Sequence, residues 1–277
     1  MGRDGTWTGP DHQPFSDGLA DAVRLLASCD VVFPAVHGPL GEDGTLAALC
    51  ELAGLPYVGS GLRAGALAMD KPTTKLIARQ AGLAVARAVT VTDTGAPPLP
   101  LPVVVKPVAA GSSHGVTLVD APERYDTAVS AALALDTRVL VEEYVHGREV
   151  DIAVLRRPDG TLLTGPVLEV VNPGNSLFDT RRKYDGSAQF LLPAPLNTEQ
   201  VRQLEDAATK LYRELGCDGV ARTDFFLTPD GRLVLNEVNT MPGMTAESQV
   251  PKMFTAAGLP YPDLLAELLD GARRRRR

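Results

Sequence analysis

The residues best suited to chemistry lie in the stretch 217–245, which reads CDGVARTDFFLTPDGRLVLNEVNTMPGMT. Two apolar runs flank an Asp-Gly pair, a strong signal for a β-hairpin because glycine tolerates the positive φ of a tight turn. Side chains alternate along a strand, so Arg222 and Asp224 share one face of the first strand. Glu237 and Asn239 share one face of the second strand. The hairpin therefore brings a guanidinium close to oxygen donors from both strands.

The donor types in this hairpin indicate a hard metal ion. Asp224, Glu237 and Asn239 offer side-chain oxygens without His or Cys, which suits Mg²⁺ bridging to substrate phosphates. A lone Asp/Glu pair would more often be a solvated pair on an open hairpin face. Here Pro242 and Gly243 shape a loop directly after the second strand, which favours the functional interpretation and predicts phosphoryl chemistry.

Length and composition limit the function classes. The 277 residues suffice for two packed domains or one large one, and the 44% hydrophobic content is typical of a globular protein. Without a long apolar run or a secretory pattern, the sequence predicts a cytoplasmic protein that does not enter membranes. The net charge of −7 argues against nucleic-acid binding, and the three scattered cysteines predict reduced thiols. The arginine run 273–277 is interpreted as a solvated tail.

The N-terminal region predicts an α/β half-domain. Apolar residues 31–36 indicate a buried parallel strand that delivers the glycine-rich loop 37–44 to a site. A helix over 45–54 and a second strand and loop over 55–61 follow. His37, which opens the glycine-rich loop, would by itself more often be a structural residue.

A strand and loop in the central region are suited to phosphate binding. The β-branched strand 102–107 carries Lys106 directly before the small-residue loop 108–115. Backbone N–H groups of such a loop can close over an anion while the ammonium neutralises its charge. The pattern is not a P-loop, because no GxxxxGK(S/T) precedes a helix.

The remaining sequence predicts scaffold elements and one long loop. Residues 172–189 are polar and without periodicity, which is typical of a functional lid or of disorder. A helix begins after Asn197, with Gln200 completing a capping box, and ends at Gly216. The other predicted elements are helices over 62–82, 122–135, 246–257 and 261–272 and strands over 138–143, 150–155 and 161–171.

The run from Arg222 through Asp224 to NEVNTMPGMT resembles the metal-binding end of the ATP-grasp enzymes, specifically the D-alanine–D-alanine ligase family. HGPLGEDG followed by GLPYVGSG, and Lys106 followed by GSSHG, resemble the same family, and the motifs occur in the expected order from about Val31 onward. The resemblance implies an α/β ATP-grasp fold, in which two α+β subdomains sandwich ATP after a truncated Rossmann-like N-terminal domain. The expected boundaries are 1–61, 62–149 and 150–277.

The resemblance also implies roles for individual residues. The expected metal ligands are Asp224, Glu237 and Asn239, the catalytic residues Arg222, Ser112, Tyr184 and Gly243, and the substrate contacts His37, Ser248 and Gln249. The expected nucleotide-binding residues are Lys71, Lys106, Ser113, Glu142, Tyr144, Val145, Glu149 and Lys183. Gln249 departs from the leucine common in the family, which bears on acceptor specificity. Family members also begin with a strand and helix whose glutamate binds the first D-alanine, and this chain is expected to start beyond them.

The resulting hypothesis is an ATP-dependent ligase that joins two D-alanines through an acyl phosphate for peptidoglycan precursor synthesis. It uses ATP with Mg²⁺ or Mn²⁺, expected as two ions, and acts as a homodimer. Tyr184 accompanies an amine acceptor in the family, which favours an amide product over an ester. The alternatives are a related ligase making another dipeptide or a secondary metabolite, a nucleotide-binding protein without catalysis, and a purely structural or interaction module.

Overall fold

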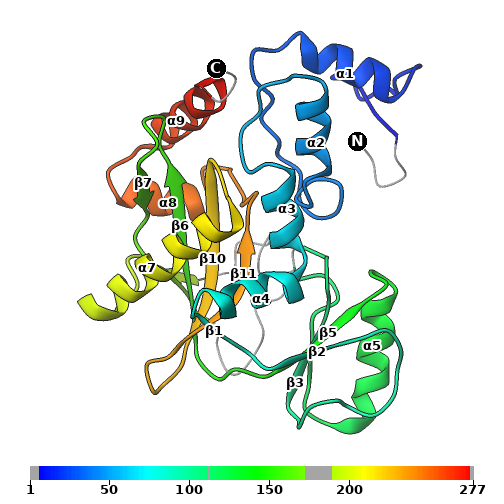
Figure 1. The fold of residues 1–277 in the computed structure, drawn as a ribbon, viewed down its shortest axis with the longest axis vertical. Coiled ribbons are helices and arrows are strands. Elements are labelled where there is room, and N and C mark those ends of the chain that lie inside the picture. The colour runs from blue at the N-terminus through cyan, green and yellow to red at the C-terminus, as the bar shows by residue number, and fades with distance from the viewer. Residues whose placement is uncertain (1–5, 112, 172–188, 275–277) are drawn as a thin grey trace.

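The hairpin predicted from the sequence forms the centre of the larger of two sheets (Figure 1). In the computed structural model, which describes residues 6–111, 113–171 and 189–274, strand β10 spans Val220–Leu227 and β11 spans Leu233–Asn239. The two strands are antiparallel, with Arg222 opposite Asn239 and Asp224 opposite Glu237. The register therefore confirms the shared faces expected from strand alternation.

The larger sheet has the order β1-β11-β10-β6-β8-β9, and β7 pairs with the outer half of β6. Its further strands are β1 (Ala84–Val85), β6 (Arg148–Arg156), β7 (Leu162–Thr164), β8 (Leu168–Val171) and β9 (Gln189–Leu191). Both faces of β6 are buried. Val150, Ile152 and Val154 pack toward α7 (Thr198–Leu215), whereas Ala153 and Leu155 pack toward α8 and α9.

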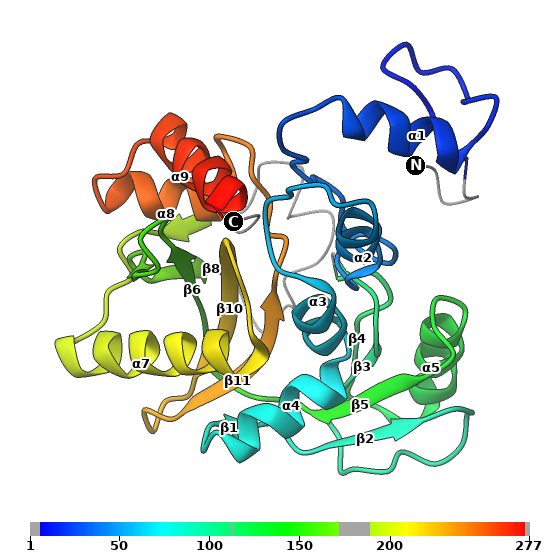
Figure 2. The same ribbon diagram turned by 45° about the horizontal axis from the view of Figure 1, so that its top comes forward.

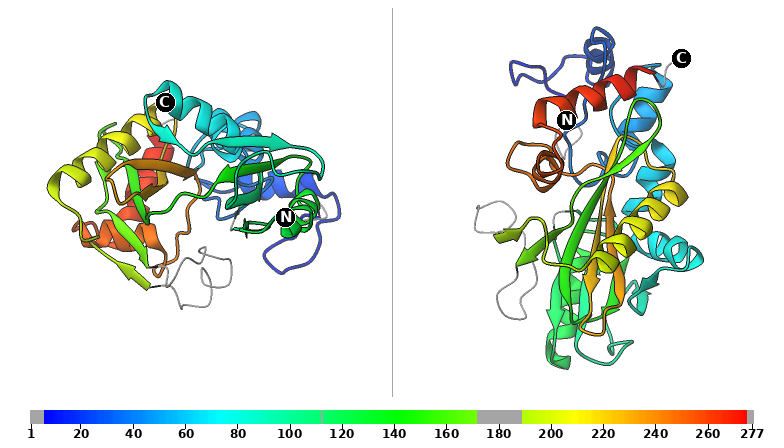
Figure 3. Two further views of the ribbon diagram at one scale, coloured as in Figure 1. Left: turned by 90° about the horizontal axis from the view of Figure 1, so that it is seen from below. Right: turned by 90° about the vertical axis from the view of Figure 1, so that its left-hand side faces the viewer.

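Helices α8 (Gln249–Ala256) and α9 (Tyr261–Arg274) thus cover the face opposite α7 (Figure 3). Because both faces are covered by helices, β6 is buried continuously from Val150 to Leu155 rather than on alternate residues. The covered sheet provides a rigid platform for the polar hairpin residues at its edge.

A smaller sheet forms a separate lobe (Figure 2). Its order is β2-β5-β3-β4, with β2 at Ala88–Val91, β3 at Val103–Pro107, β4 at Thr117–Val119 and β5 at Val139–Glu143. A short 3-10 turn, Pro122–Arg124, leads into α5 (Tyr125–Leu133), which packs on this sheet, so the predicted helix 122–135 is regular only from residue 125. Strand β3 carries Lys106 toward the larger sheet.

The predicted single helix over 62–82 is wrong in one respect that matters for the site. It divides into α3 (Leu62–Met69) and α4 (Lys71–Gln80), because Asp70 leaves the helical region and caps α4 by accepting a hydrogen bond from the Thr73 backbone N–H at 2.9 Å. Pro72 lies in the first turn of α4, where its missing N–H costs nothing. Lys71 is consequently the first residue of a new helix.

The two strands predicted in the N-terminal region are also less regular than expected. Residues 31–36 and 55–61 form one parallel bridge, between Val32 and Tyr57, which keeps the expected direction without a continuous ladder. Helices α1 (Leu19–Ala27) and α2 (Thr45–Leu52) lie beside them. The predicted strand 161–171 is interrupted after β7, because Pro166 lacks an N–H and Gly165 lies against Met253.

The segment before the smaller lobe packs with the larger sheet. Helices α3 and α4 lie in the core of the larger sheet, and β1 pairs with β11. Strand β6 also begins before residue 150. The smaller lobe therefore comprises residues 88–143, and the chain crosses between lobes on either side of it.

The capping box of α7 is confirmed and gives a stability prediction. The Asn197 side chain accepts from the Gln200 N–H at 2.9 Å, and the Gln200 side chain accepts from the Asn197 N–H at 3.1 Å. We expect Asn197→Ala to lower the free energy of unfolding by about 1 kcal/mol, measured by urea denaturation. Lys210→Ala, on an exposed position of the same helix, is the control. A loss below about 0.3 kcal/mol for Asn197→Ala would contradict the assigned cap.

Candidate active site

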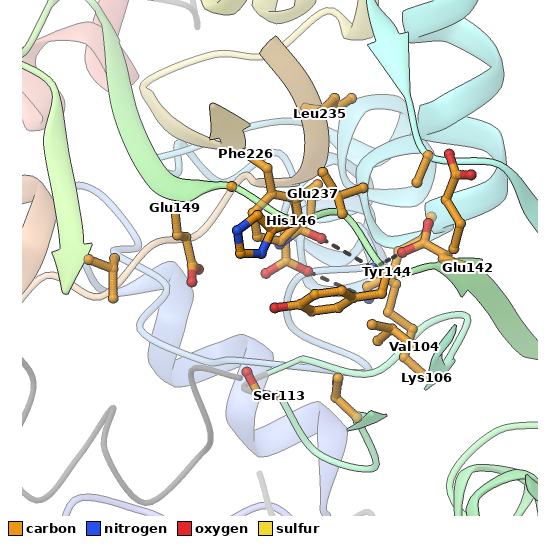
Figure 4. A pocket seen from close by; sticks show the side chains of 18 of the residues that line it. Val104, Lys106, Ser113, Glu142, Tyr144, His146, Glu149, Phe226, Leu235 and Glu237 are labelled. Carbon is orange, nitrogen blue, oxygen red and sulfur yellow. Dashed lines mark hydrogen bonds and ion pairs between the residues drawn. The ribbon is translucent and has the colours of Figure 1, made fainter. Parts of the chain in front are cut away.

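The two sheets face each other across a cavity of about 280 Å³ (Figure 4). Its walls come from both lobes: Lys106 and Glu142 from the smaller sheet, and Phe226, Leu235 and Glu237 from the hairpin. A pocket between two lobes with a mixed apolar and charged lining is typical of a small-molecule site.

Buried charged groups form the floor of this cavity. Glu142, only 5% exposed, pairs through Oε2 with the Lys106 ammonium at 2.5 Å and through Oε1 with the Lys75 ammonium at 2.7 Å. Burial would raise the pKa of Glu142, but Lys106 and Lys75 outweigh it and hold that pKa below its ordinary value. Burial lowers the pKa of Lys75, and Glu142 opposes that shift. The floor carries two ammonium groups for one carboxylate and therefore favours an anionic ligand.

Lys71 connects the small-residue loop after β3 to the hairpin. Its ammonium donates to the Ala110 carbonyl at 2.9 Å and lies 3.9 Å from Glu237 Oε2. Burial lowers the pKa of Lys71, while the nearby Glu237 carboxylate raises it. This lysine thus stands between the predicted phosphate loop and the predicted metal ligands.

The other end of the cavity has apolar walls with polar groups at the rim. Tyr144 and Val145 follow β5 and line the cavity together with Phe226 and Leu235, as Figure 4 shows for the labelled side chains. Glu149 and Ser113 line it as well, and Ser113 adopts a positive φ of 56°. The predicted nucleotide-binding residues within the described chain therefore meet in one cavity.

Arg222 and its partners form the second part of the site. The guanidinium makes a bidentate pair with Asp224, Nε to Oδ1 and Nη2 to Oδ2, both at 2.7 Å. Asn239 Nδ2 donates to Asp224 Oδ2 at 2.9 Å. Burial disfavours the charged guanidinium, yet Asp224, Asp151 and Glu237 raise the pKa of Arg222 above its ordinary value. Arg222 is therefore a permanent, rigidly held cation.

The donors at this end fit a hard divalent ion. In the described part of the chain, no group of three or more His, Cys, Asp or Glu side chains is placed to hold a metal. The candidate set contains two carboxylates and the amide of Asn239, whose donor types suit Mg²⁺ or Mn²⁺. Asp224 Oδ1 has two lone pairs and accepts one hydrogen bond from Arg222, which leaves it acceptor capacity.

His37 lies in the predicted glycine-rich loop, close to Met241 and within the field of Arg222. Its Nδ1 is 3.8 Å from Glu42 Oε1, and the Gly38 N–H donates to Glu42 Oε2 at 2.6 Å. Glu42 also lies close to the small-residue loop after β3. A Cβ atom added at Gly111 would be 2.9 Å from Glu42 Oε2. Glu42, which sequence reasoning did not select, thus anchors two loops.

The His37–Glu42 pair gives a pH-dependent prediction. The Glu42 carboxylate raises the pKa of His37, so the pair stabilises the fold fully below the unfolded pKa of about 6.5 and loses this contribution as pH rises through the folded pKa. His37 is 41% exposed, so solvent screening limits the effect to below about 1 kcal/mol. We expect His37→Gln to lower the free energy of unfolding at about pH 5.5 but not at about pH 9.

Urea denaturation at both pH values measures this difference, and the Glu42→Gln background is expected to remove it. An equal loss at both pH values would contradict the assigned pair.

The predicted acceptor-side residues lie at the start of α8. Ser248 caps this region, its Oγ accepting from the Thr245 N–H at 3.1 Å, and a Cβ at Gly243 would meet that Oγ at 3.0 Å. Gln249 Nε2 donates to Asp151 Oδ2 at 3.0 Å, and the same oxygen is 3.7 Å from Arg222 Nε. Gln249 is therefore connected to Arg222 through a carboxylate that sequence reasoning did not select. Ser112, Lys183 and Tyr184 lie outside the described residues.

Several other residues of the site were not selected from the sequence. Lys75 follows Lys71 by four residues, so helical periodicity could have placed it on the same face. Phe226 follows Arg222 and Asp224 by strand alternation. Asn236 had no such signal, because a β-bulge between Asp224 and Phe225 leaves it without a partner in β10, and its Oδ1 accepts from Lys106 at 3.2 Å.

Two family models match this chain. The model described as "D-ala D-ala ligase C-terminus" matches residues 79–270, and the one described as "D-ala D-ala ligase N-terminus" matches residues 9–60. The D-alanine–D-alanine ligase of Nocardia farcinica is 43% identical over 265 residues, covering 92% of this chain and 73% of the relative. The chain belongs to the D-alanine–D-alanine ligase family. The family uses ATP, and the expected ATP-grasp fold with a preceding N-terminal domain is confirmed.

Further D-alanine–D-alanine ligase family members and solved structures agree. The D-alanine–D-alanine ligase of Corynebacterium urealyticum is 44% identical, covering 91% of this chain and 72% of the relative. The VanG D-Ala:D-Ser ligase from Enterococcus faecalis has a TM-score of 0.78 at 38% identity, covering 88% of this chain and 73% of that one. The D-alanine–D-alanine ligase of Coxiella burnetii has the same TM-score at 33% identity, covering 90% and 69%. Among the described residues, no helix has the length and apolar character to cross a membrane.

Proposed function

We propose that this protein joins two D-alanines into D-alanyl-D-alanine at the expense of ATP, for peptidoglycan precursor synthesis. The observation that carries the proposal is the lysine-floored cavity directly beside the Arg222–Asp224 hairpin. These features support the proposal, because a cationic floor suits nucleotide phosphates and the Arg222 guanidinium suits a developing oxyanion, in a chain of the D-alanine–D-alanine ligase family.

In the first step, the carboxylate of one D-alanine attacks the γ-phosphorus of ATP, and ADP leaves. Lys71 and Lys106 neutralise charge on the phosphates, while Tyr144 and Val145 form walls for the adenine and Glu149 accepts from the ribose hydroxyls. Asp224, Glu237 and Asn239 would hold Mg²⁺ or Mn²⁺, which when bound stabilises charge on the transferring phosphoryl group. The product of this step is an acyl phosphate.

In the second step, the amine of another D-alanine attacks the acyl carbon, phosphate leaves and the amine gives up a proton. Arg222 supports the negative charge that develops on the carbonyl oxygen, together with the backbone N–H near Gly243. The bidentate pair with Asp224 holds the guanidinium in place before the substrate binds. Ser248 and Gln249 border the acceptor side, and His37 is a further substrate contact near Met241.

A second candidate function differs from the first only in the acceptor amino acid. Gln249 stands where a leucine is common, and its bond to Asp151 places a polar side chain at the acceptor side. One structural relative is described as a D-Ala:D-Ser ligase. D-Serine is therefore the second candidate acceptor.

The test is phosphate release from ATP and Mg²⁺ with and without D-alanine, with the product identified by mass spectrometry. We expect D-alanine-dependent release and the dipeptide as product. Competition between D-alanine, D-serine and D-lactate then ranks the acceptors, with amide products expected to dominate. ATP binding without D-alanine-dependent release would contradict the proposal.

The proposal also covers the oligomeric state, the metal ions and the cellular location of the enzyme. We propose a cytoplasmic homodimer with two divalent ions per site, as the resemblance of the motifs implies. Sedimentation velocity measures the oligomeric state, and a monomer at micromolar concentration would contradict the dimer.

A further inference from the structure

Lys75 borders the cavity, yet its side chain is almost completely enclosed by protein atoms. It projects from α4 and is only 3% exposed. Oxygen atoms surround its ammonium: Glu142 Oε1 at 2.7 Å, the Leu235 carbonyl at 3.3 Å and the Asn236 carbonyl at 3.2 Å. An ammonium has three N–H donors, and two of them donate to these β11 carbonyls. The charge of Lys75 pairs with Glu142, so its ammonium is held by protein oxygens on both sides.

These partners belong to different lobes. Glu142 is in β5 of the smaller sheet, whereas Leu235 and Asn236 are in β11 of the larger one. Lys75 thus links the lobes beneath the cavity. Lys106 makes a second link in parallel, from β3 to Glu142 Oε2 and to Asn236 Oδ1.

Lys106 differs from Lys75 in one respect. Within the described part of the chain, its ammonium has two oxygen partners, Glu142 and Asn236, which leaves one N–H for a ligand. Figure 4 shows Lys106 and Glu142 together at the cavity floor. The charge that a ligand meets there depends on how Glu142 is shared between the two lysines.

We infer that Lys75 is a positioning residue for the nucleotide: it takes one oxygen of Glu142, so that Lys106 keeps net positive charge and a free N–H for the anionic ligand. Without Lys75, Glu142 would neutralise Lys106 completely, and the floor would change from a net charge of one to none. With both Lys75 and Glu142 neutral, Lys106 alone restores the original net charge. The inference rests on the proposed function, because it concerns the same nucleotide site.

The experiment compares Lys75→Met, which keeps the length of the side chain, with the double variant Lys75→Met/Glu142→Gln. Titration calorimetry with a non-hydrolysable ATP analogue and Mg²⁺ measures nucleotide affinity without turnover. We expect Lys75→Met to weaken binding roughly tenfold or more, since a charge is lost in a low-dielectric floor. Glu142→Gln alone is the reference for the double variant, which is expected to bind within about threefold of it, because no carboxylate is left for Lys75 to share.

Steady-state kinetics adds a second readout. We expect the KM for ATP to rise with Lys75→Met by about the same factor as the dissociation constant, while the KM for D-alanine changes less than about threefold. Lys75→Arg, which keeps the charge, is expected to restore most of the ATP affinity. Lys210→Met, the same substitution at an exposed lysine of α7, is the control.

The outcomes separate the inference from a purely structural role. Wild-type affinity in Lys75→Met overturns the inference, and so does a tenfold loss when Lys75→Met is added to Glu142→Gln. If Lys75→Met does not fold, the comparison of the double variant with Glu142→Gln and the affinity of Lys75→Arg decide. A wild-type protein that binds no ATP analogue overturns the proposed function and the inference together, whereas wild-type binding with an unaffected Lys75→Met overturns the inference alone.

Discussion

Glu237→Ala is expected to abolish D-alanine-dependent phosphate release, with a loss of at least about a thousandfold in kcat. Glu237 lies opposite Asp224 in the hairpin and 3.9 Å from the Lys71 ammonium, at the point where phosphates and metal would meet. Removing this carboxylate deletes a ligand of the proposed metal and leaves the Lys71 ammonium with less compensating charge. Several kcal/mol of transition-state stabilisation are lost with such a ligand.

The matched control is Glu247→Ala, an exposed carboxylate whose side chain is 87% accessible and pairs with Lys252 at 2.9 Å. It is expected to keep wild-type kcat. Thermal unfolding of both variants verifies that the fold is intact. A Glu237→Ala variant with more than about a tenth of wild-type kcat would contradict the assignment of Glu237 as a metal ligand.

Arg222→Met is expected to lower kcat by about 10² to 10³ and also to destabilise the fold by about 3–5 kcal/mol. The first effect follows from loss of the cation proposed to support the developing oxyanion. The second follows because Asp224, only 2% exposed, would remain as a buried charge without its bidentate partner. Steady-state kinetics and urea denaturation measure the two effects separately.

Two further variants separate catalysis from stability at this position. Arg222→Met/Asp224→Asn removes the stranded charge, so we expect stability to recover while activity stays low. Arg222→Lys keeps the charge but not the bidentate geometry, so we expect an intermediate loss of stability and a clear loss of kcat. If kcat of Arg222→Met stayed within about tenfold of the wild type, the oxyanion role would be wrong.

Local patterns in the sequence determined much of the scaffold. The Asp-Gly turn and strand alternation predicted the hairpin in which Arg222 lies opposite Asn239. Asn197 and Gly216 predicted both ends of α7. These features rest on contacts between residues close in sequence, for which turn, capping and periodicity rules hold. Motif resemblance then assigned several of the polar residues that line the cavity, including Lys106 and Glu149.

Periodicity and alternation were less reliable where one residue in a segment favours a different local structure from its neighbours. Pro72 and the Asp70 cap divided a helix that periodicity alone predicted as continuous. The bulge in the hairpin turned Asn236 toward Lys106, although strict alternation would place it on the face away from Glu237. In both cases one residue changes the direction of the chain without changing its apolar pattern.

The pairing of buried charges was decided only by the tertiary structure. Lys75 meets β11 carbonyls 160 and 161 residues away, and Gln249 meets Asp151 across 98 residues. A sequence does not reveal such pairs, because burial makes each charge costly until the fold supplies its partner. The sequence by itself therefore determined the family, the hairpin and the residue types of the site. The packing of α4 between the lobes decided that Lys75 shares Glu142 with Lys106.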